Sequence, residues 1–331
     1  MIGVLIYLSF RGPSEAESIN LGHILILQAL INWPHFMASY RLLYSPVSNV
    51  KKHPFATIYV PVLLIVLASI AIFTGQGVQA NTLYVNQTLV YFFWLGAAFY
   101  LAWHYTGQAW GMVCSFAFLA GVKMDSAERL MIRASLRVLL VWHVVWGAQD
   151  LPAAWLGFVH PYLLDILHLV TITAFITFAT GIIGFIRISK RTGLKPTPQM
   201  IAPWIAIHLW YLTLNFEPNM YLFVQFSHAL QYLIFPLRVE LNRKGHHKTG
   251  KNVFTQFRLG ISLYLALVCI GIVVFYLPEV VFQHGNQAFT IAVLVASVIS
   301  IHHYFVDGCI WKISNPDVRA QLFAHVVPKR N

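Results

Sequence analysis

Residues 55–75 read FATIYVPVLLIVLASIAIFTG and contain no charged side chain. About 20 predominantly apolar residues are enough for an α-helix to cross the hydrocarbon core of a bilayer. Pro61 interrupts this stretch without adding a charge. The stretch therefore predicts a transmembrane helix, and the rest of the chain can be searched for similar windows.

The composition of the whole chain also indicates a membrane protein. Of its 331 residues, 58% are hydrophobic and 10% are charged, whereas soluble domains carry about 25% charged residues. Disorder is excluded as well, because there is too little polar sequence to support it. The apolar windows predict an all-α, polytopic helical bundle that forms a single transmembrane domain over residues 1–331. The nine predicted spans lie near residues 21–43, 55–75, 88–106, 133–149, 161–186, 200–215, 218–238, 256–278 and 286–306.

The loops between these spans alternate in charge. One side receives 21 of the 22 basic residues, within residues 41–52, 123–137, 187–195, 238–258 and 312–330. The other side holds acidic residues and almost no basic ones. The positive-inside rule assigns the basic side to the cytoplasm, which places the C-terminus there. Topology thus explains the net charge of +11, and we expect no nucleic-acid partner.

Two apolar segments do not fit this pattern of spans. Residues 1–10 are about half the length that a span requires. Residues 107–121 read GQAWGMVCSFAFLAG and follow a complete predicted span. The pattern therefore allows a re-entrant or interfacial helix at residues 107–121.

Histidine is the most unusual polar residue of the chain, since the 15 histidines outnumber the 11 Asp and Glu together. Ionisable side chains at membrane depth are costly and usually face the protein interior. Counting about 1.5 Å per residue along each predicted span places several histidines in the middle and cytoplasmic half of the bilayer. These are His35, His104, His143, His208, His228, His302 and His303. Agreement in depth is what a metal site inside a helical bundle requires.

The chemistry of these residues favours a metal site near the cytoplasmic side. Imidazole is a common ligand of iron, copper and zinc. The candidate ligands are His35, His104, His228, His302, His303 and His143. Asp307 is the only carboxylate close to this layer, and its i, i+4 relation to His303 places both on one helix face. We expect Asp307 to orient a ligating ring, and Tyr232, which flanks this layer, is a second candidate catalytic residue.

A structural role is the alternative for each of these residues. A lone histidine inside a membrane most often hydrogen-bonds to a neighbouring helix, and this interpretation is preferred for His23, His160 and His168. For His143 and His208 both interpretations remain open. Tyr232 could equally anchor its helix at the membrane interface.

Four short motifs along residues 34–307 suggest a family. They are Pro34-His35 in NWPHF, His104-Tyr105 in AWHYTGQ, Phe226-Ser227-His228 in FSHALQY, and His302 to Asp307 in HHYFVD. In order and rough spacing the chain resembles the bacterial Brp/Blh-type β-carotene dioxygenases, which are polytopic membrane proteins with non-haem iron held by histidines. The resemblance implies a bacterial inner-membrane location.

The resemblance also implies a site and a reaction. Fe(II) would be held by His35, His104, His228 and either His302 or His303, with one position left for O2. A hydrophobic substrate, carotenoid-like or lipid-like, would enter from the bilayer.

The sequence departs from the family pattern in two places. Tyr232 stands where the family has a second histidine, and no acidic residue follows Pro34-His35 closely. The fourth ligand would therefore come from His303, His143 or His208.

Three other classes of function remain as alternatives. In a haem-b electron-transfer protein, pairs of these histidines would bind haem iron axially, and an intense Soret band would identify it. A transporter would often show internal repeats and broken helices, but no repeat is evident here. A structural membrane protein would have little use for so many buried histidines. Copper or zinc could replace iron, because imidazole suits all three metals.

Overall fold

Helices make up nearly all of the part of the chain that the structure describes, as the sequence predicts. The computed structural model describes residues 25–45, 47–75, 78–79, 82–149, 151–216, 224–230, 253–281 and 291–310, together with Leu233, Pro236 and Val239. The strands within these residues are β1 (Val78–Gln79) and β2 (Thr82–Leu83), which form a short antiparallel pair.

Five helical segments among the described residues are long and apolar enough to cross a membrane. They are Phe55–Phe73, Ser126–Ala148, Ala153–Thr192, Phe257–Phe275 and Ile291–Ile310. Each overlaps one of the predicted spans, and together they indicate a membrane protein. The remaining four spans, and with them the count of nine, stay a prediction.

The chain divides into two compact units. Unit 1 consists of residues 1–16 and 95–221, and unit 2 of residues 17–94 and 222–331. The helices of unit 1 are α8 (Ser126–Ala148), α9 (Ala153–Leu156), η3 (Gly157–Tyr162), α10 (Leu163–Thr192) and α11 (Pro198–Phe216). Those of unit 2 are η1 (Gln28–Asn32), α4 (Trp33–Tyr44), α5 (Val47–Lys52), η2 (Phe55–Tyr59), α6 (Val60–Phe73), α13 (Val253–Phe275), α14 (Leu277–Val281) and α15 (Ile291–Ile310). Whether they form one transmembrane domain stays a prediction.

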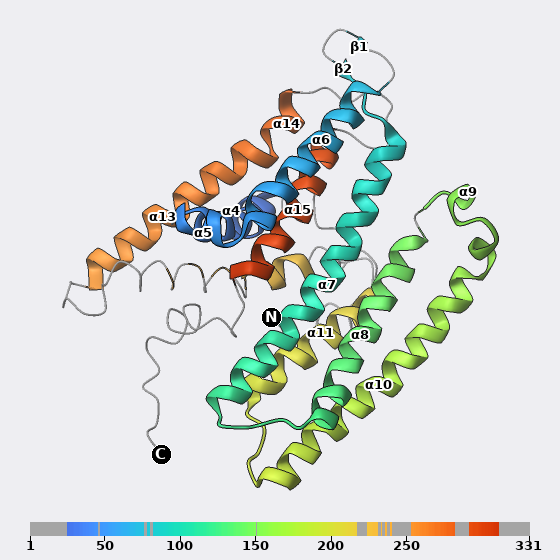
Figure 1. The fold of residues 1–331 in the computed structure, drawn as a ribbon, viewed down its shortest axis with the longest axis vertical. Coiled ribbons are helices and arrows are strands. Elements are labelled where there is room, and N and C mark those ends of the chain that lie inside the picture. The colour runs from blue at the N-terminus through green and yellow to red at the C-terminus, as the bar shows by residue number, and fades with distance from the viewer. Residues whose placement is uncertain are drawn as a thin grey trace. The chain divides into compact units, whose positions relative to one another are not determined.

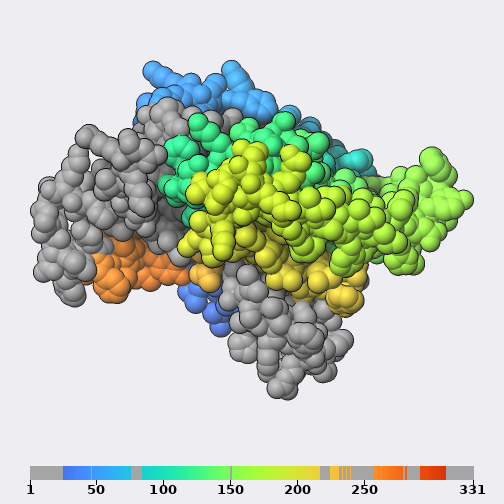
Figure 2. Space-filling view, turned by 90° about the horizontal axis from the view of Figure 1, so that it is seen from below, coloured from blue at the N-terminus to red at the C-terminus, as the bar shows by residue number. Residues whose placement is uncertain are grey.

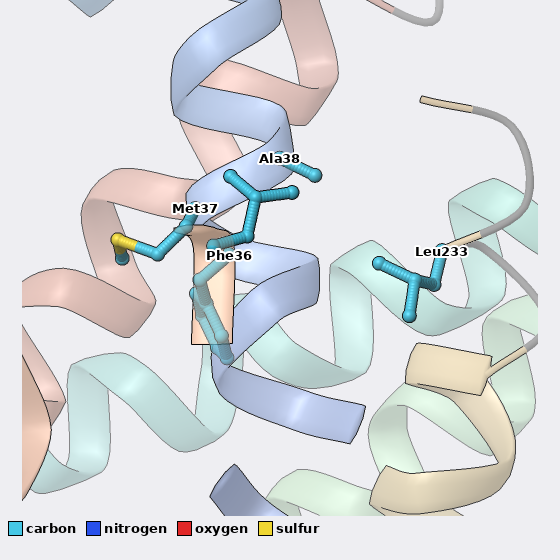
Figure 3. Close-up of a cluster of buried hydrophobic side chains, with 5 residues drawn as sticks. Phe36, Met37, Ala38 and Leu233 are labelled. Carbon is cyan, nitrogen blue, oxygen red and sulfur yellow. The ribbon is translucent and has the colours of Figure 1, made fainter. Parts of the chain in front are cut away.

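Helix α4 is the central element of unit 2. It packs against α13 and α15, and α15 also contacts α6 (Figure 1). Phe36, Met37 and Ala38 of α4 are buried in one cluster with Leu233 and with Leu267 of α13 (Figure 3). The hydroxyl of Tyr40 donates a hydrogen bond of 3.0 Å to the carbonyl of Ile299, which ties α4 to α15.

The start of α4 is shaped by Pro34. A proline has no N–H and is best tolerated in the first turn of a helix, where Pro34 lies. Pro34 cannot donate the α-helical bond to the carbonyl of Leu30, and the hydroxyl of Tyr264 on α13 donates to this carbonyl instead. A second close contact follows at Gly271, where a Cβ would lie 2.7 Å from Trp33 Cβ. Small residues of this kind let membrane helices approach closely.

In unit 1 the most extensive packing between described helices is that of α8 against α10 (Figure 1). Asp125 caps α8 by accepting from the backbone N–H of Glu128 at 2.7 Å, and the Glu128 carboxylate accepts from the Asp125 N–H at 2.8 Å. Arg191, at the end of α10, binds the buried Glu128 carboxylate with Nε and Nη2 at 2.8 and 2.7 Å. Two of the basic segments, 123–137 and 187–195, thus meet at one end of the pair, as the predicted alternation requires.

The opposite face of α10 is apolar and exposed, as a lipid-facing surface would be. Only 17% of the most apolar window of the helical segment Ala153–Thr192 is buried. Leu169, Ile172 and Ile176 are each more than half exposed. Figure 2 shows α10, in yellow-green, lying uncovered on this face of unit 1.

Helix α7 corrects the prediction for residues 107–121. It runs without interruption from Gln87 to Leu119, through the predicted span 88–106 and the apolar segment after it. A re-entrant segment needs a chain reversal, which a continuous helix excludes. No proline occurs within α7, so nothing in the backbone chemistry stops the helix before Leu119. The helix begins in unit 2 and continues into unit 1.

The Asp125 cap makes the stability of the α8–α10 pair sensitive to acid. The backbone N–H of Glu128, with the nearby guanidinium groups of Arg187 and Arg191, holds the pKa of the Asp125 carboxyl below its usual value. The ionised Asp125 carboxylate therefore makes its full contribution to the free energy of unfolding above the unfolded-state pKa of about 3.9. This contribution is lost as the pH falls through the lower folded-state pKa. We expect Asp125→Asn to lose less thermal stability than wild type between about pH 5 and about pH 3.

Thermal unfolding in detergent at the two pH values measures this difference. The control is Asp165→Asn, which removes an exposed carboxylate from α10 and leaves the Asp125 cap intact. A parallel pH dependence of Asp125→Asn and wild type would show that the cap carries no linked protonation.

Candidate metal centre

Four buried polar residues of unit 2 come together between helices. His35 lies in the first turn of α4, His228 in the helical residues 224–230, and His303 and Asp307 one turn apart on α15. Their exposed fractions are 1%, 4%, 1% and 3%, respectively. Burying ionisable groups so completely at membrane depth is costly unless other groups compensate, and this marks the cluster as a candidate site.

The geometry places metal-binding atoms close to one another. His35, His303 and Asp307 each offer a ligand atom, and these atoms lie within 4.8 Å of one another. The ring centroids of His35 and His303 are 4.8 Å apart, and those of His35 and His228 are 5.4 Å apart. Asp307 Oδ2 lies 3.5 Å from His303 Nε2, in the i, i+4 relation expected from the sequence. Two residues on α15 and one on α4 thus face a common point.

Aromatic side chains enclose this group on the α4 side. The ring of Phe36 lies 4.3 Å from that of His303, and Tyr40 lies 6.5 Å from it. Phe36 also belongs to the apolar cluster with Met37, Ala38, Leu233 and Leu267, and Tyr40 packs against this cluster. Because the centre is buried, charges within it are screened weakly by solvent and interact strongly.

His302 has a different role from its neighbour His303. Its Nε2 lies 2.7 Å from the carbonyl oxygen of Ala56. A carbonyl only accepts hydrogen bonds, so this nitrogen donates. The ring also lies against Tyr40, with centroids 5.2 Å apart. The structure therefore brings His303, rather than His302, into the group of His35 and Asp307.

Pro61 explains why the carbonyl of Ala56 can accept this bond. Ala56 lies in η2, where hydrogen bonds follow the wider π-helical register and the N–H of Val60 bonds to Phe55. In that register the donor to Ala56 would be residue 61, and proline has no N–H. The side chain of His302 supplies the missing donor and ties α15 to η2. This role of His302 was not predicted from the sequence, although a proline inside an apolar span is a signal for a freed carbonyl.

Two other predicted ligands, His104 and His143, belong to unit 1. His104 is buried on α7, in the part of that helix that belongs to unit 1. His143 of α8 also belongs to unit 1, where its ring lies 5.7 Å from that of Tyr211. Their roles as ligands stay predictions from the sequence. Tyr232 lies outside the described residues.

The donor set of the cluster suits a metal ion. Imidazole and carboxylate together bind first-row transition metals, and two histidines with one carboxylate are the ligands of many non-haem Fe(II) oxygenases. Ligand atoms about 2.0–2.2 Å from a metal lie at most slightly over 4 Å apart, close to the spacing found here. The buried group of His35, His303 and Asp307 could therefore hold a metal ion, with His228 beside it.

Comparison with known proteins adds no assignment. No protein-family model, curated protein or solved structure matches the chain. The functional argument therefore rests on the cluster itself and on the motifs of the sequence.

Proposed function

We propose that the protein is a membrane-embedded oxygenase that uses a non-haem Fe(II) ion and O2 to oxidise a hydrophobic, carotenoid-like or lipid-like substrate. The observation that supports this proposal is the buried group of His35, His303 and Asp307, whose ligand atoms lie within 4.8 Å of one another. A haem site needs only axial histidines, whereas a non-haem metal ion is balanced by a carboxylate beside its imidazole ligands. The likeness of NWPHF and HHYFVD to the motifs of β-carotene dioxygenases points to the same chemistry.

Each residue of the centre would have a distinct task. Fe(II), when bound, supplies the redox chemistry that activates O2. His35 and His303 would bind the ion through neutral imidazole nitrogens, and Asp307 would offset its positive charge, either as a ligand or by accepting a ring N–H. Phe36 and Met37 would exclude water from the centre. His228, beside His35, and His104, on the sequence prediction alone, are proposed as further ligands.

The apolar exterior of unit 2 fits a substrate that arrives from the lipid. Val62, Leu63 and Ile65 of α6 are each more than half exposed, and α13 has similar exposed residues. Such faces contact acyl chains in a bilayer and present no charge to a hydrophobic molecule. We propose that the substrate is taken up directly from the membrane.

The topology that we propose has nine spans and a cytoplasmic C-terminus. A reporter fused after Asn331 should therefore be cytoplasmic, and one inserted at residues 76–87 should be external. Paired alkaline phosphatase and fluorescent-protein fusions measure both positions. The same side for both reporters would contradict the proposed topology.

The function is tested on the full chain purified in a mild detergent. Elemental analysis should find iron bound to the protein, and the absorption spectrum should lack a Soret band. With β-carotene as the substrate, an oxygen electrode should record O2 consumption. A chelator should stop this consumption, and added Fe(II) should restore it whereas Zn(II) should not.

The outcomes separate the alternatives. A Soret band that disappears in His35→Ala would identify a haem protein. Zinc or copper at one ion per chain, without O2 consumption, would retain the metal centre and contradict the oxygenase. The absence of any metal above the buffer background would contradict both.

A further inference from the structure

Unit 1 contains an apolar pocket among three of its helices. The pocket has a volume of about 140 Å³ and lies between α8, α10 and α11. Its walls include Trp142 from α8, Ala174 and Phe178 from α10, and His208 and Tyr211 from α11. All of these residues belong to unit 1, whereas His35, His303 and Asp307, the group that supports the proposed metal site, belong to unit 2. The pocket therefore does not depend on the proposed function.

Aromatic rings give the pocket its form. Phe178 lies 5.0 Å from His208, and Trp142 lies 5.4 Å from Tyr211, measured between ring centroids. Trp142 is held in place because its Nε1 donates a hydrogen bond of 2.8 Å to Thr171. Rings arranged in this way favour a flat, ring-bearing ligand, since aromatic pairs gain energy from stacked and edge-on contacts.

His208 contributes a hydrogen-bond acceptor. Its Nδ1 lies 2.8 Å from the carbonyl of Trp204, which can only accept, so Nδ1 carries the hydrogen. In a neutral imidazole the other nitrogen is then an acceptor. This Nε2 is buried and has no hydrogen-bond partner among the residues that the structure describes. A ligand that satisfies His208 must therefore bring a hydrogen-bond donor.

Tyr211 provides a second polar group on the same helix face. It follows His208 by three residues, and positions i and i+3 of a helix are neighbours. Its hydroxyl is also buried without a hydrogen-bond partner in the described part of the chain. Thr171, a partly buried residue of the wall, is already engaged, because it accepts from Trp142 and donates to the carbonyl of Leu167. Asn215, also in the wall, is exposed. The buried polar groups of the described pocket wall that are left for a ligand are thus one acceptor and one hydroxyl.

We infer that this pocket binds a membrane-soluble ring compound that carries a single hydroxyl group, such as a phenol or a cyclic alcohol. The ligand hydroxyl donates to His208 Nε2 and accepts from the hydroxyl of Tyr211, while its ring lies among Trp142, Phe178 and Ala174. A buried polar group without a partner is unfavourable, so a ligand that satisfies both groups gains affinity over an apolar ring of the same size.

Size and access agree with this ligand. An apolar protein cavity of about 150 Å³ holds one benzene molecule, so the pocket accommodates one six-membered ring. Phe175 lines the same pocket and is 56% exposed. Because the exposed face of α10 is apolar, a molecule dissolved in the lipid reaches the pocket past Phe175 without crossing water.

The test uses 4-fluorophenol and fluorobenzene as probes of the full chain in detergent. Fluorine NMR measures saturable binding, with protein-free micelles as the blank. Wild type should bind 4-fluorophenol more tightly than fluorobenzene. Tyr211→Phe, which removes only the hydroxyl, should weaken 4-fluorophenol about fivefold, the size of one hydrogen bond, and leave fluorobenzene unchanged.

Two variants of α10 locate the binding. Ala174→Leu fills the pocket and should abolish saturable binding of both probes. Ala179→Leu adds the same atoms at an exposed position outside the pocket and should bind both probes like wild type. Equal affinity of wild type for the two probes would overturn the hydroxyl assignment. Saturable binding that survives Ala174→Leu, or its absence from wild type, would overturn the site.

Discussion

His303→Ala should reduce the metal affinity of the protein about 100-fold, since a full set of protein ligands contributes about 10–16 kcal/mol in well-studied zinc sites and each ligand carries a share. His303 is 1% exposed, and the centroid of its ring lies 4.8 Å from that of His35, so the variant removes a buried ligand nitrogen from the centre. His35→Ala should have a similar effect. Elemental analysis of detergent-purified protein, normalised to folded chain, measures the loss.

The matched control is the adjacent residue of the same helix. His302 bonds to the carbonyl of Ala56 through Nε2, so His302→Ala removes a helix-to-helix contact and should lower the unfolding temperature while the metal content is retained. Equal metal content in His302→Ala and His303→Ala would mean that the cluster of His35, His303 and Asp307 is not the metal site.

Asp307→Asn should reduce metal affinity or metal-dependent oxidation about 10–100-fold, the usual effect of losing a carboxylate that orients or balances a metal site. The carboxylate is 3% exposed and lies 3.5 Å from His303 Nε2. Asparagine has nearly the same shape, so the fold should be retained while the negative charge is lost. Metal titration and O2 consumption measure the two effects separately.

An exposed carboxylate provides the control for this variant. Asp165 lies near the start of α10 in unit 1, and Asp165→Asn should bind metal and consume O2 like wild type. If Asp307→Asn retains full metal content and wild-type turnover, Asp307 does not belong to the site. The proposal would then rest on histidines alone.

The helices could be predicted from the sequence because long apolar windows have a simple physical cause. The stretch at residues 55–75 becomes the helical segment Phe55–Phe73, and the window at 286–306 overlaps α15 (Ile291–Ile310). The division of residues 88–121 could not be predicted, because hydropathy records where a helix is apolar and not where it ends. Helix α7 therefore appeared as one span and a separate segment.

The sequence predicts at which level along a helix each histidine of the candidate site lies. It does not predict to which side of the helix the histidine points. His302 and His303 lie at nearly the same depth, yet successive helical residues point about 100° apart. The choice between them depends on what α15 meets, which is Ala56 on one side and His35 on the other. The i, i+4 pairing of His303 with Asp307 was predictable, because it lies within one helix.

The bond between His302 and the carbonyl of Ala56 depends on two different residues. Ala56 supplies the carbonyl, and Pro61 leaves this carbonyl without a backbone donor. Every amino acid carries a backbone carbonyl, so position 56 can change during evolution to any residue small enough for its buried place. Pro61 cannot change as freely, because an N–H at that position would compete with His302 for the carbonyl. Among homologues, His302 should therefore covary with Pro61, whereas the residue at position 56 should vary independently of His302.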